Sequence, residues 1–169
     1  MPPLSLPSRV EDVFHTFLSC EFATLGKDGA PIAWPVAPLY LPERGRFLIT
    51  TSIGAPQKAF NVRRNPHVAL LFSDPTGSGL ADPPAVLVQG DAEIPHEVTT
   101  WNEDLERFWA VLARRQPSSQ AYSSNALMRA LTGWYYMRLL IYVTPRRIRW
   151  WPDGDFEQPA QEIEVSDVG

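Results

Sequence analysis

Reactive and metal-binding side chains are scarce in this sequence of 169 residues. Its one cysteine, Cys20, cannot form an internal disulfide, and this favours a reducing compartment such as the cytoplasm. The three histidines, His15, His67 and His96, lie far apart and lack the spacing of zinc ligands. The sequence contains no GxGxxG, Walker, HExxH, CxxC or GxSxG motif. We therefore expect neither a bound metal nor a catalytic side chain.

Long apolar runs are also absent, so no segment reaches the length of a membrane-spanning helix. The first residues, MPPLSLPS, lack the charged and apolar regions of a signal peptide, and we expect a cytoplasmic protein without a membrane partner. The net charge is −4, but residues 152–169 contain six acidic residues and no basic one. We expect this acidic tail to be flexible. The rest of the chain has no Lys/Arg-rich face, so nucleic acid is not an expected partner.

The most informative stretch is Arg46–Phe72, which reads as a strand, a turn, a short helix and a second strand. The first strand ends in three hydroxyl residues, Thr50, Thr51 and Ser52. Pro56 suits the first turn of the helix, where its missing N–H is no loss, and Lys58 follows in the same turn. Hydroxyls, helix N–H groups and an ammonium thus converge, and this combination is typical of a phosphate site.

The charges around Lys58 support an anion site. Five basic residues and no acidic residue occur between Arg44 and Ser73. Arg63 and Arg64 fall in the last helical turn, where cations offset the helix dipole, and a structural role suits them. Lys58 opposes that dipole in the first turn, which favours an anion ligand over a solvated surface lysine.

The rest of the pattern predicts a mainly β fold with helices, of the α+β class. We expect strands at 22–25, 31–40, 46–51, 67–72, 85–94, 134–143 and 147–151, and helices at 8–19, 98–114 and 118–131. Strand 31–40 contains three prolines, which cannot donate to a ladder, so we expect it to be an edge strand or to be bulged, with Trp34 near a ligand or in the core. Short hairpin-like connections predict an antiparallel sheet closed into a barrel.

These residues resemble the pyridoxamine 5′-phosphate oxidase-like superfamily of FMN-binding split β-barrels. The matching segments are FATLGKDGAPIAWPVAPLYLPERGRFLITT, QKAFNVRRNPHVALLF, VLVQGDAEI and TPRRIRWW. The resemblance implies one flavin-binding split-barrel domain over residues 1–151, with a helical insertion at 96–133. It also implies a homodimer with flavin sites at the subunit interface.

The resemblance further implies which residues contact the cofactor. Trp34, Pro35 and Val36 match residues beside the flavin ring, and Ile49 and Thr50 match others that line the cofactor. Gln57 and Lys58 match a basic pair that binds the phosphate. Trp151 matches a tryptophan that touches the cofactor.

Several positions depart from the oxidase pattern. The oxidase has arginine at the positions of Trp34 and Gln57, lysine at that of Leu39 and glutamine at that of Ala85, and its arginine-rich C-terminus is missing here. These differences weigh against pyridoxamine phosphate as the substrate, which the sequence does not identify. The loop SIGAPQK followed by NVRRNP is similar to the deazaflavin-binding branch of the superfamily. We therefore expect an FMN-dependent oxidoreductase, with a deazaflavin-dependent reductase or a flavin-binding protein without turnover as alternatives.

The segment Trp134–Tyr142 gives a separate reason to expect a dimer. It is apolar or aromatic at every position except Arg138 and does not alternate with polar residues. Both faces of such a strand must be covered. A second subunit is the simplest cover that the sequence suggests.

Overall fold

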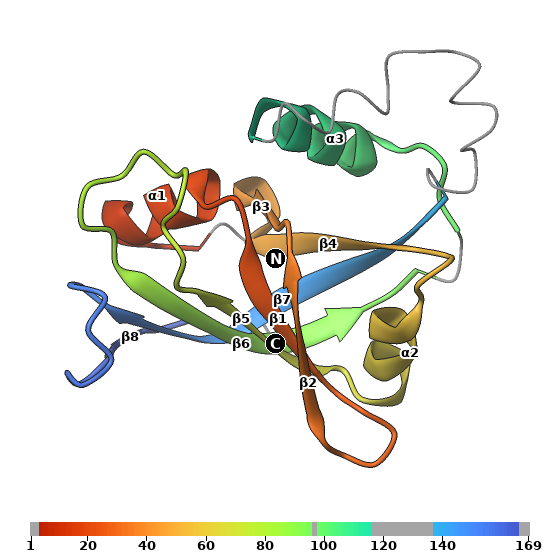
Figure 1. Ribbon diagram of the computed structural model, residues 1–169, viewed down its shortest axis with the longest axis horizontal. Coiled ribbons are helices and arrows are strands. Elements are labelled where there is room, and N and C mark those ends of the chain that lie inside the picture. The colour runs from red at the N-terminus through yellow and green to blue at the C-terminus, as the bar shows by residue number, and fades with distance from the viewer. Residues whose placement is uncertain (1–3, 96–97, 116–136, 166–169) are drawn as a thin grey trace.

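The computed structural model describes residues 4–95, 98–115 and 137–165 as a curled antiparallel sheet with three helices (Figure 1). The helices are α1 (Ser8–Thr16), α2 (Gln57–Arg64) and α3 (Glu103–Arg115), and Pro42–Arg44 form a 3₁₀ turn. The strands are β1 (Cys20–Leu25), β2 (Pro31–Val36), β3 (Leu39–Leu41), β4 (Arg46–Ser52), β5 (His67–Phe72), β6 (Ala85–Glu93), β7 (Arg138–Trp151) and β8 (Gln161–Ile163). The expected helix at 118–131 and residues 134–136 of the expected strand lie outside the described residues.

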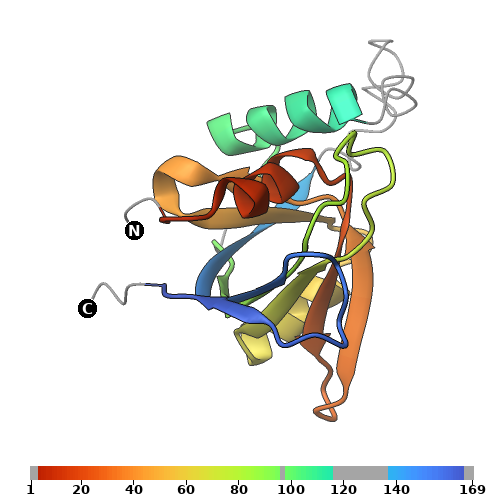
Figure 2. The ribbon, with the colours of Figure 1, turned by 90° about the vertical axis from the view of Figure 1, so that its left-hand side faces the viewer.

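The strands follow the order β2-β1-β5-β6-β7-β4-β3, and β8 adds to β7. Every pairing within the described residues is antiparallel. The sheet curls into a half-barrel, as the second view shows (Figure 2), and β2 and β3 form its two ends. The predicted fold class is confirmed. The expected strand 31–40 is instead divided between β2 and β3, which lie at opposite edges of the sheet, so that the proline-rich β2 is an edge strand.

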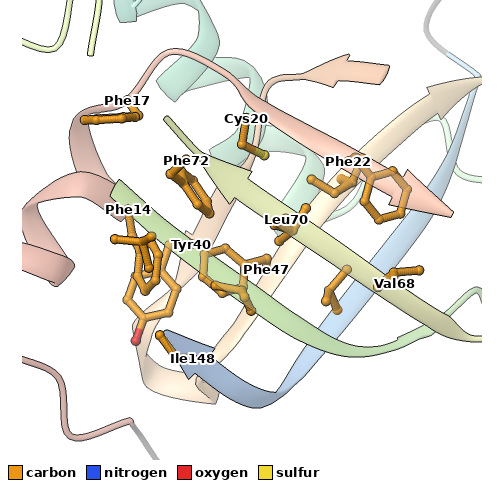
Figure 3. Packing of buried hydrophobic residues seen from close by; sticks show 14 of the residues in the cluster. Phe14, Phe17, Cys20, Phe22, Tyr40, Phe47, Val68, Leu70, Phe72 and Ile148 are labelled. Carbon is orange, nitrogen blue, oxygen red and sulfur yellow. The ribbon is translucent and has the colours of Figure 1, made fainter. Parts of the chain in front are cut away.

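The core lies inside the curl and combines aromatic with aliphatic side chains (Figure 3). Alternate residues of the strands point inward, among them Phe22 of β1, Phe47 of β4 and Phe72 of β5, all fully buried. Phe14 of α1 packs among them, with its ring centroid 4.8 Å from that of Phe47 in an edge-to-face arrangement. Helix α1 therefore closes one opening of the half-barrel.

Strand β7 is continuous, whereas the sequence predicted a break at Pro145. The register against β6 shifts between Gln89 and Gly90, so that Arg147 pairs with Gln89 and Pro145 with Gly90. This bulge accommodates a residue that cannot donate an N–H. Gly90 is required there, because a Cβ atom on it would lie 2.2 Å from the carbonyl oxygen of Thr144.

The two faces of β7 belong to two separate apolar clusters. Ile141 packs in the main core, whereas Leu140 and Tyr142 pack against Leu105 and Phe108 of α3. Figure 1 shows α3 lying over β4 and β7, outside the curl. At residues 140–142 this chain therefore covers both faces of β7 itself, so this part of the strand gives no independent reason for a second subunit; residues 134–136 of the apolar segment lie outside the described residues.

Part of the acidic tail, which the sequence predicts to be flexible, forms strand β8. Strand β8 pairs with Ile148–Trp150, and Glu162 accepts two hydrogen bonds from Arg147, at 2.9 and 2.6 Å. An acidic residue of the tail thus pairs with a basic residue of β7. No helix in the described part of the chain is both long enough and apolar enough to span a membrane.

Candidate functional site

The predicted phosphate site lies at the end of β4 and the start of α2. Strand β4 ends at Ser52, Pro56 caps α2, and Lys58 lies in its first turn. Because side chains alternate along β4, Thr50 faces a pocket while its neighbours Ile49 and Thr51 point into the protein and are buried. The Thr51 hydroxyl donates to the carbonyl of Ala55 at 2.8 Å and so stabilises the turn.

Ser52 and Gln57 also bond locally. The Ser52 hydroxyl accepts the N–H of Gly54 at 3.2 Å, and the Gln57 amide donates to the side chain of Asn61 at 2.9 Å. Asn61 is buried and donates in turn to the Thr24 hydroxyl at 2.9 Å. These two predicted site residues therefore stabilise the turn and α2, and neither lines the pocket.

The pocket itself has a volume of about 350 Å³ and lies between the end of β2, the end of β4, α2, α3 and the start of β7. Four of the predicted residues line the pocket: Pro35, Val36, Thr50 and Lys58. The full lining is Ser19, Pro35, Val36, Ala37, Thr50, Lys58, Phe108, Trp109, Leu112 and Arg138.

Trp34 is not among the lining residues, but it contacts Lys58, which is. The Lys58 ammonium lies 5.2 Å from the centroid of the Trp34 ring, within the range of a cation–π contact. Burial, and after it the positive charge of Arg138, holds the pKa of Lys58 below its usual value. An anion in the pocket would offset both effects, because it would restore favourable interactions to the charged ammonium.

Arg138 is a pocket residue that the sequence analysis did not assign. It begins β7, and its guanidinium lies 5.0 Å from the centroid of the Trp109 ring on α3. The signal was present in the sequence, because Arg138 is the one charged residue in the apolar segment 134–142. What the sequence did not reveal is that β4 and β7 are neighbours, which brings Arg138 opposite Ser52 in register.

Trp151 lies away from this pocket. It ends β7, thirteen positions after Arg138, which corresponds to roughly 40 Å along an extended strand. Its indole N–H donates to the carbonyl of Gln158 at 3.1 Å, and its ring packs on Phe156. The two ends of β7 therefore cannot contact one small molecule within a single chain.

A buried ionic group fixes α3 above the pocket. The carboxylate of Asp104 accepts hydrogen bonds from Arg44 at 2.8 and 2.5 Å and from the Tyr142 hydroxyl at 2.7 Å. Burial disfavours its charge, but these hydrogen bonds outweigh burial and hold the pKa of Asp104 below its usual range. At the other end of α3, Arg115 donates to the carbonyls of Phe17 and Pro38, at 3.0 and 3.4 Å.

The described lining defines what the pocket can do chemically. It contains two cations, one hydroxyl from β4, one serine and several apolar or aromatic groups, with no carboxylate, histidine or cysteine. Such a set can bind an anion and a planar apolar ring, but it offers no obvious proton donor or acceptor near neutral pH. Within the described residues, no cluster of three or more potential metal ligands occurs.

Comparisons with known proteins bear on the family and the fold. A family model described as pyridoxamine 5′-phosphate oxidase matches residues 6–147. No curated protein matches the sequence. A conserved hypothetical protein of Mycobacterium tuberculosis superposes with a TM-score of 0.63 at 22% identity, covering 99% of this chain and 94% of that one.

Two further solved structures have the same fold. A Clostridium acetobutylicum protein related to general stress protein 26, of the pyridoxinephosphate oxidase family, superposes with a TM-score of 0.62 at 12% identity and covers 94% of this chain and 93% of its own. An F420 reductase superposes with a TM-score of 0.54 at 21% identity, covering 82% of this chain and 94% of that chain. At these identities the likeness establishes the fold, and the chemistry must come from the pocket.

Proposed function

The chain belongs to the pyridoxamine 5′-phosphate oxidase family, and from this premise we propose that it is an FMN-binding oxidoreductase. In this proposal the phosphate end of the cofactor binds at Lys58 and Thr50. The flavin ring lies along Pro35 and Val36, with Trp34 beside it. The substrate is a small molecule whose identity the lining does not specify.

One observation carries the proposal: Lys58 and Arg138 share a pocket whose described lining contains no carboxylate. Burial, and after it the positive charge of Arg138, lowers the pKa of Lys58, and an anion in the pocket would offset both effects on the ammonium. Pro35, Val36 and the aromatic residues of α3 supply an apolar surface beside the cations, as a flavin phosphate requires. The residues present therefore fit the cofactor.

The roles of the protein groups follow from this lining. A bound flavin supplies the electron-transfer chemistry that the side chains lack. Lys58 and Thr50 hold its charged end and thereby fix the position of the ring. Phe108 and Leu112 on α3 restrict water at the other side of the pocket. In this proposal, no residue of the described lining has to donate or accept a proton.

A deazaflavin such as F420 is the second candidate for the same pocket. The segment Ser52–Lys58 resembles the deazaflavin branch of the superfamily, and the structural neighbours include an F420 reductase. The protein is then a reductase that transfers hydride. A third alternative is a flavin-binding protein without turnover, because the described lining contains no substrate-specific group.

We also propose that the protein is a homodimer. The support is the position of Trp151, which matches a cofactor-contacting tryptophan of the family but lies at the far end of β7 from Arg138. A second subunit placing its own Trp151 beside the pocket would reconcile the two observations. The argument for a dimer therefore depends on the cofactor site and not on the apolar pattern of β7.

Identification of the cofactor tests the proposal directly. The purified protein is denatured, and the released small molecule is analysed by absorbance and mass spectrometry. Protein with no cofactor is titrated with FMN and with F420 by fluorescence. Binding of FMN at micromolar or lower concentration, with reduction of the bound flavin by an electron donor, is expected. Binding of F420 alone selects the second candidate, and binding of neither cofactor contradicts both.

A further inference from the structure

Asn61 is the polar member of the buried face of α2, which it shares with Ala59 and Val62. It is fully buried. Its side-chain amide donates to the hydroxyl of Thr24 on β1 at 2.9 Å, and Thr24 is itself only 2% exposed. Each group thus provides a hydrogen-bond partner for the other away from water, and the helix meets this strand at one defined point.

The oxygen of the same Asn61 side chain connects both ends of the helix. It accepts a hydrogen bond from the Gln57 amide at 2.9 Å and another from the guanidinium of Arg64 in the last turn. Helix α2 has only eight residues and no side-chain cap at its start, so its orientation depends on such contacts. These residues, with Thr24, form a network without a carboxylate, which orders α2 without placing a negative charge beside it.

Lys58 lies next to this network on α2. It directly follows Gln57 and precedes Asn61 by three positions, and residues three apart on a helix are neighbours on its surface. With 3.6 residues per turn, a helix that slips by one residue turns each side chain by roughly 100°. The contact that fixes Asn61 on β1 therefore also fixes the direction in which Lys58 projects.

Helix α2 contacts the hairpin of β1 and β2 at two points. Thr24 of β1 pairs with Ile32 of β2, so Trp34, two positions further along β2, is a diagonal neighbour of Thr24 on the same face. Thr24 accepts the hydrogen bond from α2, and the Trp34 ring has the Lys58 ammonium 5.2 Å from its centroid. The end of β2 then lines the pocket. The network thus sets the place of the cation relative to the apolar wall that β2 provides.

We propose that Asn61 is the positioning residue of Lys58 and that Thr24 is the group in the sheet that holds Asn61. The ligand of Lys58 is the anionic group discussed above, so its identity as a flavin phosphate rests on the proposed function. A buried amide bonded to one hydroxyl selects a single packing of the helix, whereas an apolar side chain at the same position tolerates several.

Two variants break the network with little change in side-chain size. Thr24→Val replaces the hydroxyl by a methyl group, and Asn61→Leu replaces the amide by an apolar group. Thr24→Ser retains the hydroxyl, and Thr24→Val serves alone if Asn61→Leu does not fold. Val86→Ala is the matched control, because Val86 is fully buried in the main core and does not line the pocket. It lowers stability without touching α2.

The first measurement needs no ligand. The chain has two lysines, and Lys27 is exposed in the turn between β1 and β2. Competitive labelling of the amines with acetic anhydride across pH gives the pKa of each lysine. Burial, and after it the charge of Arg138, lowers the pKa of Lys58, so a displaced and more exposed Lys58 should titrate closer to Lys27. We expect this upward shift in both network variants, and not in Thr24→Ser or the control.

The second measurement is the preference for FMN over riboflavin, which lacks the phosphate. Thr24→Val and Asn61→Leu should lower the ratio of the two affinities between about three- and tenfold. Lys58→Met should then cost less affinity for FMN in the Thr24→Val background than in the wild type, because the two sites are coupled. Val86→Ala should lower the Tm and leave the ratio unchanged. Equal losses for FMN and riboflavin in the network variants would assign Asn61 to the stability of the fold alone and overturn the proposal.

The two measurements separate this inference from the proposed function. If the protein binds no flavin but the pKa of Lys58 rises in both network variants, the proposed function fails and the positioning of Lys58 by Asn61 stands. If FMN is preferred through Lys58, but the network variants keep both the wild-type ratio and the wild-type labelling, the proposed function stands and the positioning role is wrong.

Discussion

The hydroxyl of Tyr142 on β7 donates to the carboxylate of Asp104 on α3 at 2.7 Å. Arg44, from the turn before β4, donates to both oxygens of the same carboxylate. One buried acid therefore connects a strand, a turn and a helix that are distant in the sequence. Because α3 forms one wall of the pocket, this connection belongs to the architecture of the site as well as to the stability of the fold.

Replacing Asp104 by Asn should destabilise the protein by about 2–3 kcal/mol, since Arg44 and Tyr142 lose a charged acceptor in a buried position. The folded-state pKa of Asp104 is lowered, so its contribution is present above the unfolded-state pKa and is lost as the pH falls through the folded-state value. Thermal unfolding between pH 7 and pH 3 checks this. The difference in stability between wild type and Asp104→Asn should narrow toward the acidic end. Glu106→Gln, at an exposed acid on the same helix, serves as the control and should unfold like the wild type.

Lys58→Ala should weaken the affinity for the bound cofactor roughly ten- to a hundredfold, because a charge-assisted hydrogen bond contributes about 1.5–3 kcal/mol. Lys58→Arg keeps the charge and should retain more of the affinity. The measurement is a fluorescence titration with FMN and with the deazaflavin. An unchanged affinity in Lys58→Ala for whichever cofactor binds contradicts the assignment of Lys58.

The same lysine predicts a pH dependence of binding. Its pKa is lowered in the free protein, so the ammonium begins to lose its proton at a lower pH than an exposed lysine does. Affinity for a phosphate ligand should therefore fall on the alkaline side, and this fall should be reduced in Lys58→Arg. Titrations from pH 7 to pH 10 with riboflavin as the uncharged control measure the effect. A fall of equal size for riboflavin shows that the titration reports another process.

Trp34→Leu should act chiefly on cofactor affinity. The indole supplies apolar area and a cation–π contact to Lys58, but it provides no proton for the reaction. Once a substrate is known, kcat at saturating cofactor should change little while the Kd for the cofactor rises. A loss of kcat with unchanged cofactor affinity would assign Trp34 to the substrate instead.

The histidines and the cysteine are expected to be dispensable for turnover. Neither His15 nor His67 lines the pocket, and burial raises the pKa of the Cys20 thiol, which makes it a poor nucleophile. His96 falls outside the described residues. Alanine variants should retain kcat within tenfold, well short of the ~10²–10⁴-fold cost of losing a general acid or base. A thousandfold loss in a cofactor-loaded histidine variant would identify a proton donor.

If the protein is a homodimer, its mass in solution should be twice that of one subunit, and its cofactor site should be shared between subunits. Light scattering at micromolar concentration should give twice the mass of 19.0 kDa. If Trp151 of one subunit completes the pocket of the other, Trp151→Ala should weaken cofactor binding even though it lies far from Lys58 in its own chain. Measuring mass and cofactor affinity on the same variant separates loss of the dimer from loss of a contact. A monomer with full cofactor affinity contradicts the proposal.

Local sequence patterns predicted most of the fold. Strand His67–Phe72 has its predicted bounds, and the prolines of β2 correctly placed it at the edge of the sheet. These features depend on backbone chemistry that each residue carries with it. The continuity of β7 through Pro145 was missed, because it depends on a bulge formed by the partner strand β6.

The site was less predictable than the fold, because part of it depends on contacts between segments that are distant in the sequence. The motif of β4 and α2 is continuous in sequence, so Thr50 and Lys58 were brought together by a short turn. Alternation along β4 then decided that Thr51 points inward, a detail that required the register of the sheet. Arg138 and Trp109 come from distant segments, and their meeting depends on how α3 packs over β7.

Helix α3 enters the chain between β6 and β7, two strands that remain neighbours in the sheet whatever connects them. It is held on the sheet by apolar packing of Leu105 and Phe108 and by hydrogen bonds of Asp104 and Arg115. A change confined to this connection can therefore alter the α3 wall of the pocket while leaving the wall formed by β4 and α2 in place.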